Sequence, residues 1–136
     1  AGINTAETAT LVAILKLGRG RVFAGVPDSE LRQFRASMYH VEARIVDAAL
    51  QVTDRALEAG DLGLARWALT QGLLVSPDHE DLVAGCLRTE YQAGNMDKVS
   101  ELVDHLSATA RRLGVDLNED TTRIIDTVTH ADRRAS

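Results

Sequence analysis

The sequence of 136 residues contains few of the residues that cross-link or interrupt a fold. It has a single cysteine, Cys86, which cannot form an internal disulfide and is compatible with a reducing compartment. It has only two prolines, and aromatic residues make up 4% of the chain. These scarcities disfavour a disulfide scaffold and a β-sandwich, and they predict an all-α domain.

Long apolar runs and clusters of basic residues are also missing. No stretch approaches the roughly 20 consecutive apolar residues of a membrane span, so we expect no membrane insertion and a cytoplasmic location. The formal net charge is −5, whereas binding to a phosphate backbone depends on clustered Lys and Arg. We therefore expect no direct nucleic-acid binding by this chain. It begins at "AGINTAET" without Met, which indicates a fragment of a longer protein.

Residue patterns for catalysis or metal binding are absent as well. The chain contains neither a G-x-x-x-x-G-K-[ST] phosphate loop nor a G-x-S-x-G nucleophile elbow. Cys86 lies on an apolar helical face, which indicates a small buried side chain rather than a nucleophile. We expect a non-catalytic protein with no cofactor and no metal, because the histidines show no ligand spacing with each other or with Cys86. Their positions are 40, 79, 105 and 130.

Apolar residues recur at three- and four-residue steps between glycines and prolines, which predicts about six helices. A first helix is expected over residues 5–17, after a capping box formed by Asn4 and Glu7. The "GRGR" that follows at 18–21 can end this helix or cradle an anion. From residue 30 to 59 there is no Gly or Pro, so we expect one long helix, or two with a bend near residues 39–40. Later helices are expected to be capped by Asp61, Asn95 and Asn118.

One stretch of sequence occurs twice. Ala59-Gly60-Asp61 returns as Ala93-Gly94-Asn95, and the two glycines are 34 residues apart, which is the period of a tetratricopeptide unit. A turn glycine allows the tight reversal between two antiparallel helices. We predict a single domain over 1–136, with repeat units at about 46–79 and 80–110. Its fold is an all-α, tetratricopeptide-like stack of about six antiparallel helices, in which the terminal helices cap the two ends.

A set of short motifs recurs along the chain at the ends of the expected helices: Arg19-Gly20, Pro27, Ala59-Gly60-Asp61, Ala93-Gly94-Asn95 and Leu113-Gly114-Val115-Asp116. With these motifs most of the chain resembles the bacterial transcriptional activator domain, a tetratricopeptide-like family found chiefly in actinobacterial regulators. The resemblance implies a protein-interaction module that relays partner binding or oligomerisation to an effector domain outside this chain. The segments "RGRVFAGVP" and "ARW" are similar to those of a branch found in membrane proteins with a lysin motif. That branch implies the alternative of a structural scaffold in an envelope-linked protein, with no transcriptional role.

Tetratricopeptide domains bind partners on the first helix of each hairpin, and this resemblance implies the candidate groove. Arg88 would offer a charged fork to a carboxylate of a protein partner, and Tyr91 an aromatic face. The alternative is that these residues are merely solvated, or are covered by the long N-terminal helix. The full candidate set is Asp47, Leu50, Asp54, Leu57, Glu58, Asp81, Ala84, Arg88, Tyr91 and Gln92.

The only tryptophan, Trp67, lies off the expected inward row at 62, 65, 69 and 73. It is either an interface anchor or a side chain packed on a neighbouring helix, here the N-terminal one. Repeat stacks tend to have exposed ends, so a homodimer is also compatible with the sequence.

Overall fold

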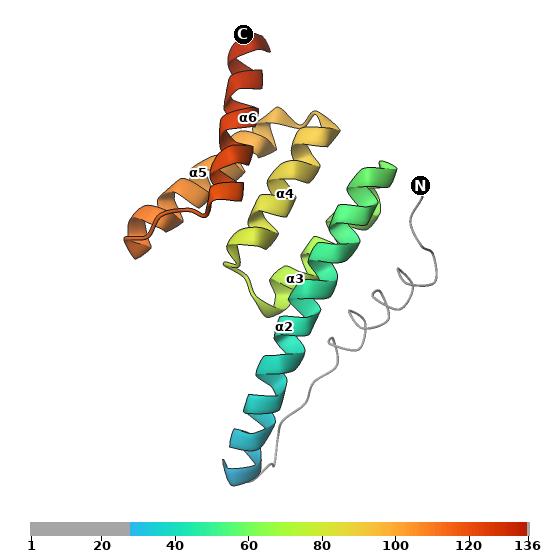
Figure 1. Cartoon of the computed structure of the whole chain (residues 1–136), viewed down its shortest axis with the longest axis vertical. Coiled ribbons are helices and arrows are strands. Elements are labelled where there is room, and N and C mark those ends of the chain that lie inside the picture. Colours follow the sequence, from blue (N-terminus) through green and yellow to red (C-terminus); the bar gives the residue numbers. More distant parts are fainter. Residues whose placement is uncertain (1–27, 136) are drawn as a thin grey trace.

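The structure is a computed structural model that describes residues 28–135 (Figure 1). This part of the chain is all-helical and contains no strand, which confirms the all-α prediction. The helix expected over residues 5–17 and the "GRGR" segment lie outside the described residues, so the count of six helices stays a prediction. The described helices are α2 (Asp28–Ala59), α3 (Leu62–Val75), α4 (Glu80–Ala93), α5 (Met96–Leu113) and α6 (Glu119–Ala135).

The longest helix, α2, continues for 32 residues without a break near Tyr39, which confirms the single-helix alternative. Its second half is amphipathic, and Ile45, Ala49 and Val52 are buried in the core. Its first half extends past the connection between α3 and α4 (Figure 1). Tyr39 and Val41 are exposed there.

Two glycine turns form the helical hairpins. Gly60 and Gly94 have φ angles of +74° and +79°, a region that glycine enters without steric cost. In both turns the residue after the glycine donates its N–H to a carbonyl of the preceding helix, from Asp61 to Ala56 and from Asn95 to Glu90. The first turn reverses the chain from α2 to α3, and the second from α4 to α5. The predicted positions of the turns are thus confirmed.

The side-chain caps follow the predictions in two of three cases. The Asp61 carboxylate accepts the N–H of Leu64 at 3.1 Å, and α6 begins with an equivalent contact from Asn118. Asn95 is the N-cap residue of α5, so its predicted position is confirmed, but its side chain makes no cap hydrogen bond. It donates instead to Glu90 at 3.4 Å.

Helix α4 lies at the centre and contacts α2, α3, α5 and α6. One core cluster lies between α2, α3 and the start of α4, and a second lies between α4, α5 and α6. The first consists of Ile45, Val46, Ala48, Ala49, Val52, Ala68, Leu69 and Leu82. The second consists of Val83, Leu87, Val99, Leu106 and Val128.

Glycine within the helices allows the first cluster to pack closely. A Cβ at Gly72 would lie 2.8 Å from Leu82 Cδ2 and 3.0 Å from Ala49 Cβ, so α2, α3 and α4 approach one another at this point. At Gly85 a Cβ would lie 2.7 Å from Leu69 Cδ2, so α3 and α4 also approach each other closely there. Among the described residues no helix is long and apolar enough to cross a membrane.

We expect Gly72→Ala to lower the free energy of unfolding. Overpacking a close-packed site costs about 1–3 kcal/mol, whereas alanine gains about 0.5–1 kcal/mol over glycine within a helix. The matched control is Gly63→Ala in the same helix, because the nearest atom to its Cβ would be Asp61 Oδ1 at 3.7 Å. Urea denaturation should show a lower free energy of unfolding for Gly72→Ala than for the parent protein, and no such decrease for Gly63→Ala. Equal gains in both variants would contradict the close approach.

Candidate partner-binding face

Polar side chains follow one side of α2 and the equivalent side of α4. Steps of seven and eleven residues place Asp54 and Glu58 on the same helical side as Asp47. The corresponding positions 34 residues later are Asp81, Arg88 and Gln92 on α4. All of these are exposed except Arg88, which is half-buried. The polar face is defined here as Asp47, Gln51, Asp54, Glu58, Asp81, Arg88, Gln92 and Asn118.

Two contacts join α2 and α4 across this face. Arg88 Nη1 donates to Asp54 Oδ1 at 2.9 Å, and Gln92 Nε2 donates to the carbonyl of Leu57 at 3.1 Å. The ion pair is exposed, and such pairs contribute about 0–1 kcal/mol, so it orients the helices more than it stabilises them. Arg88 thus pairs with Asp54 through one of its donor atoms, and the expectation that it offers its charge to a partner's carboxylate stays a prediction.

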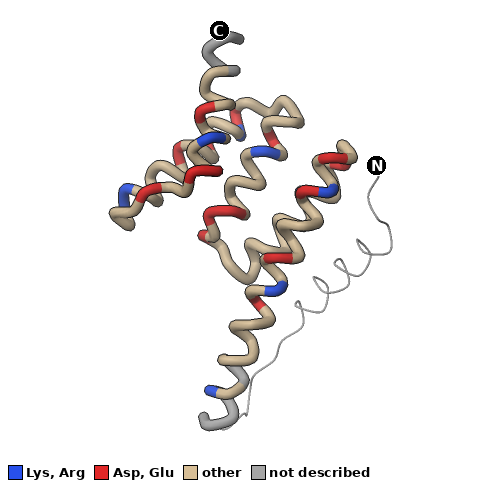
Figure 2. Tube along the Cα trace, in the orientation of Figure 1, with Lys and Arg blue, Asp and Glu red and all other residues tan. Residues whose placement is uncertain are grey.

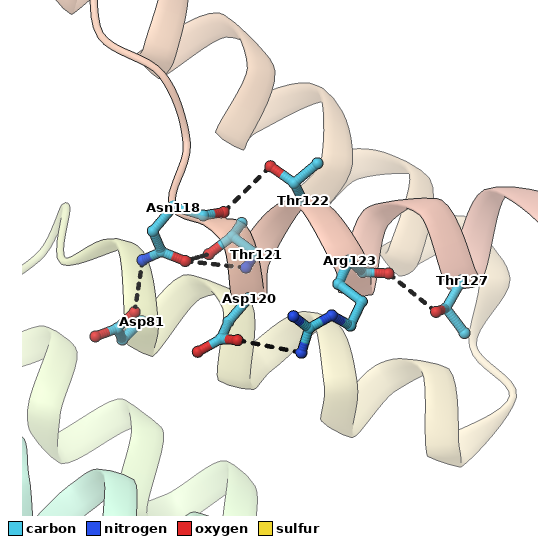
Figure 3. Close-up of polar contacts among 7 residues, drawn as sticks. All are labelled: Asp81, Asn118, Asp120, Thr121, Thr122, Arg123 and Thr127. Atoms are coloured by element: carbon cyan, nitrogen blue, oxygen red, sulfur yellow. Dashed lines mark hydrogen bonds and ion pairs between the residues drawn. The ribbon is translucent and has the colours of Figure 1, made fainter.

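Asn118 joins α6 to α4 at the other end of the polar face (Figure 3). Its Oδ1 accepts hydrogen bonds from the backbone N–H and the hydroxyl of Thr121, a residue in the first turn of α6. Its Nδ2 donates to Asp81 Oδ1 at 3.1 Å, and its backbone N–H donates to Glu80 Oε1 at 2.8 Å. The sequence predicted the cap but not the contacts with α4. One residue therefore both begins a helix and docks it.

Other candidate groove residues belong to the core. Ala84 and Leu57 are 5% and 9% exposed, so the expectation that they line a surface is wrong. Leu50 is half-buried and packs against the first core cluster, and Tyr91 packs against the second. Ala84 and Tyr91 are covered because four helices contact α4, and Leu50 and Leu57 are covered because α2 packs against α3 and α4.

Trp67 is half-buried on α3 and packs against the first core cluster. This agrees with the expectation of a side chain packed on neighbouring helices. Its expected contact with the helix over residues 5–17 lies outside the described residues.

The opposite side of α4 carries an ion pair that sequence patterns did not indicate. Arg66 on α3 donates twice to Glu90, from Nε to Oε2 at 3.0 Å and from Nη2 to Oε1 at 2.9 Å. The Glu90 side chain is only 12% exposed. The hydrogen bond from Arg66 holds the pKa of Glu90 below its usual value, with smaller help from Asn95. The two residues are 24 positions apart, so no local spacing reveals the pair.

Cys86 is half-buried and packs against the first core cluster. Burial raises the pKa of its thiol, which disfavours the nucleophilic thiolate. Within residues that the structure describes, no group of three or more His, Cys, Asp or Glu side chains is arranged to hold a metal ion.

Glu90→Gln is expected to lower the free energy of unfolding at pH 7, because it removes a carboxylate that accepts two hydrogen bonds from Arg66. Folding lowers the pKa of Glu90, so the stabilisation is present above the unfolded pKa, about 4.3, and is lost as the pH falls through the folded value. Urea denaturation should therefore show a larger difference from the parent protein at pH 7 than at pH 3.

Glu101→Gln is the matched control for this measurement. It removes the carboxylate of the exposed pair between Lys98 and Glu101 and should change stability by less than about 0.5 kcal/mol at either pH. A deficit of Glu90→Gln that is the same at both pH values would show that the charge of Glu90 contributes nothing.

Comparison with known proteins gives no relative. No family model matches the chain, and neither a curated protein nor a solved structure is significantly similar to it. The resemblance to the bacterial transcriptional activator domain therefore stays a prediction.

Proposed function

We propose that this chain is a non-catalytic protein-interaction module of tetratricopeptide-like type. It relays contact with a protein partner, or with a second copy of itself, to an effector domain. The observation that carries the proposal is the 34-residue register of the polar face. Asp54 and Arg88 occupy equivalent positions in the two hairpins and contact each other at 2.9 Å.

The turn glycines and the position of α6 support the same reading of the fold. Gly60 and Gly94 close two hairpins in one register and have nearly the same φ. Helix α6 packs against α4, as the first helix of a third unit would. Stacked hairpins of this kind bury one face on each neighbour and leave a continuous surface along their first helices. Here those helices are α2, α4 and α6.

The polar face is suited to bind a protein because it is both ordered and available. Its helices are fixed to one another by side-chain contacts, so little conformational freedom is lost on binding. The side chains of Gln51 and Glu58 are exposed and make no hydrogen bond with other described residues. Acidic residues lie along both α2 and α4 (Figure 2). This charge opposes contact with DNA, so transcription regulation in a cytoplasmic regulator would act through an attached domain.

The isolated chain should bind duplex DNA no more tightly than non-specific proteins do, with a Kd no lower than about 10⁻⁶ M at physiological salt. Fluorescence anisotropy of labelled duplexes of varied sequence measures this. Tight and sequence-dependent binding by the chain alone would contradict the proposed role.

A photo-crosslinking amino acid at position 51 should capture the partner within the full-length protein, since Gln51 lies in the middle of the polar face. The matched control places it at Asp104, an exposed position on α5 away from this face. Mass spectrometry of the adducts distinguishes a separate protein from a second copy, and light scattering across concentrations checks the latter. Equal crosslinking from both positions, or none from Gln51, would contradict the assignment of the face.

A further inference from the structure

A small cavity opens where α2 passes the connection between α3 and α4. Its volume is about 230 Å³. Pockets for drug-sized ligands measure about 300–1,000 Å³, so this cavity suits a single side chain rather than a whole cofactor. Its lining residues are Tyr39, Glu42, Ala43, Val46, Asp47, Val75, Ser76 and His79.

The cavity lies between α2 and α4. At the equivalent place between α4 and α6, a hydrogen bond joins the two helices. His79 precedes α4 as Asn118 precedes α6, and Asp47 lies one repeat before Asp81. Between α4 and α6, Asn118 Nδ2 donates to Asp81 Oδ1 at 3.1 Å. Between α2 and α4, the equivalent residues line an open cavity instead.

Two polar groups that line this cavity have no partner among the described residues. The Nδ1 atom of His79 is buried without a hydrogen bond, and the His79 side chain makes no cap contact with α4. The Asp47 side chain is exposed and makes no hydrogen bond or ion pair with residues 28–135. A buried polar atom without a partner is costly, so His79 would gain from a ligand that donates a hydrogen bond, and the Asp47 carboxylate is free to accept a second one.

We propose that this cavity binds a basic side chain, arginine or lysine, of the protein partner. The Asp47 carboxylate accepts a charge-assisted hydrogen bond from the cation, and the unpartnered Nδ1 atom of His79 accepts another. Tyr39 is 75% exposed and offers its ring to the cation. The apolar stem of the basic side chain packs on Ala43 and Val75. That the cation comes from a protein partner rests on the proposed function, whereas binding of the cation itself does not.

The test is an NMR titration of the whole ¹⁵N-labelled chain with Nα-acetyl-arginine amide and Nα-acetyl-lysine amide. Nα-acetyl-citrulline amide, which has nearly the shape of the arginine probe without its charge, is the control ligand. We expect saturable shifts at Ser76 and His79 with a basic probe, and about tenfold weaker binding of the citrulline probe. Equal binding of the arginine and citrulline probes, or no saturable shift with either basic probe, would overturn the proposal.

A pair of variants assigns the binding to Asp47. Asp47→Asn should weaken binding of the arginine probe about tenfold. Asp104→Asn removes the same charge from α5 and should leave the affinity for this probe unchanged. Equal losses in both variants would mean that only the net charge matters, which overturns the site. Circular dichroism verifies that both variants keep the helical content of the parent.

Two further measurements identify the source of the cation. A pentapeptide with one central arginine should bind more tightly than n-propylguanidinium, a free cation with the same single charge and nearly the same size as the side chain. Tighter binding of n-propylguanidinium would overturn a protein side chain as the ligand. The crosslinking at Gln51 remains a separate readout. If the arginine probe binds but the crosslinker at position 51 captures nothing, the cavity is supported and the proposed function fails. If the crosslinker captures a partner but the arginine probe does not bind, only the cavity is rejected.

Discussion

Three helices meet at Gly72, and the arrangement of the rest of the structure depends on this close approach. The absent side chain leaves room for Leu82 from α4 and Ala49 from α2. Because α4 can lie so near both helices of the first hairpin, the two hairpins stack in register. Asp54 and Arg88 can then reach each other from equivalent positions. A larger residue at Gly72 would separate the helices and divide the polar face.

Stability and orientation come from different parts of the molecule. Buried apolar side chains in the two core clusters supply most of the free energy, since apolar burial is the dominant favourable term in folding. The exposed pair between Asp54 and Arg88 adds little energy but selects one angle between α2 and α4. On the opposite side of α4, Glu90 is mostly buried and receives two hydrogen bonds from Arg66. Helix α4 is thus held from both sides.

Local features could be predicted from the sequence, and contacts between helices could not. Gly60 had to adopt a left-handed conformation to end α2, and a short polar side chain such as Asp61 had to follow it. The pair of Arg66 and Glu90 depends on which faces of α3 and α4 meet, and periodicity does not specify that. Ala84 was assigned to a surface because equivalent positions are exposed in the general repeat pattern. Here α4 is surrounded by helices, and this position is buried.

The polar face crosses from α2 to α4 near His79 and from α4 to α6 near Asn118. A comparison of these two places shows how a different residue at one repeat position can leave a site for a ligand. The amide of Asn118 accepts hydrogen bonds from Thr121 with its oxygen and donates to Asp81 with its nitrogen. The ring of His79 performs neither task at the start of α4, and its Nδ1 atom has no hydrogen-bond partner within the described part of the chain. Where residues 28–135 supply no donor to Asp47, a partner can supply one.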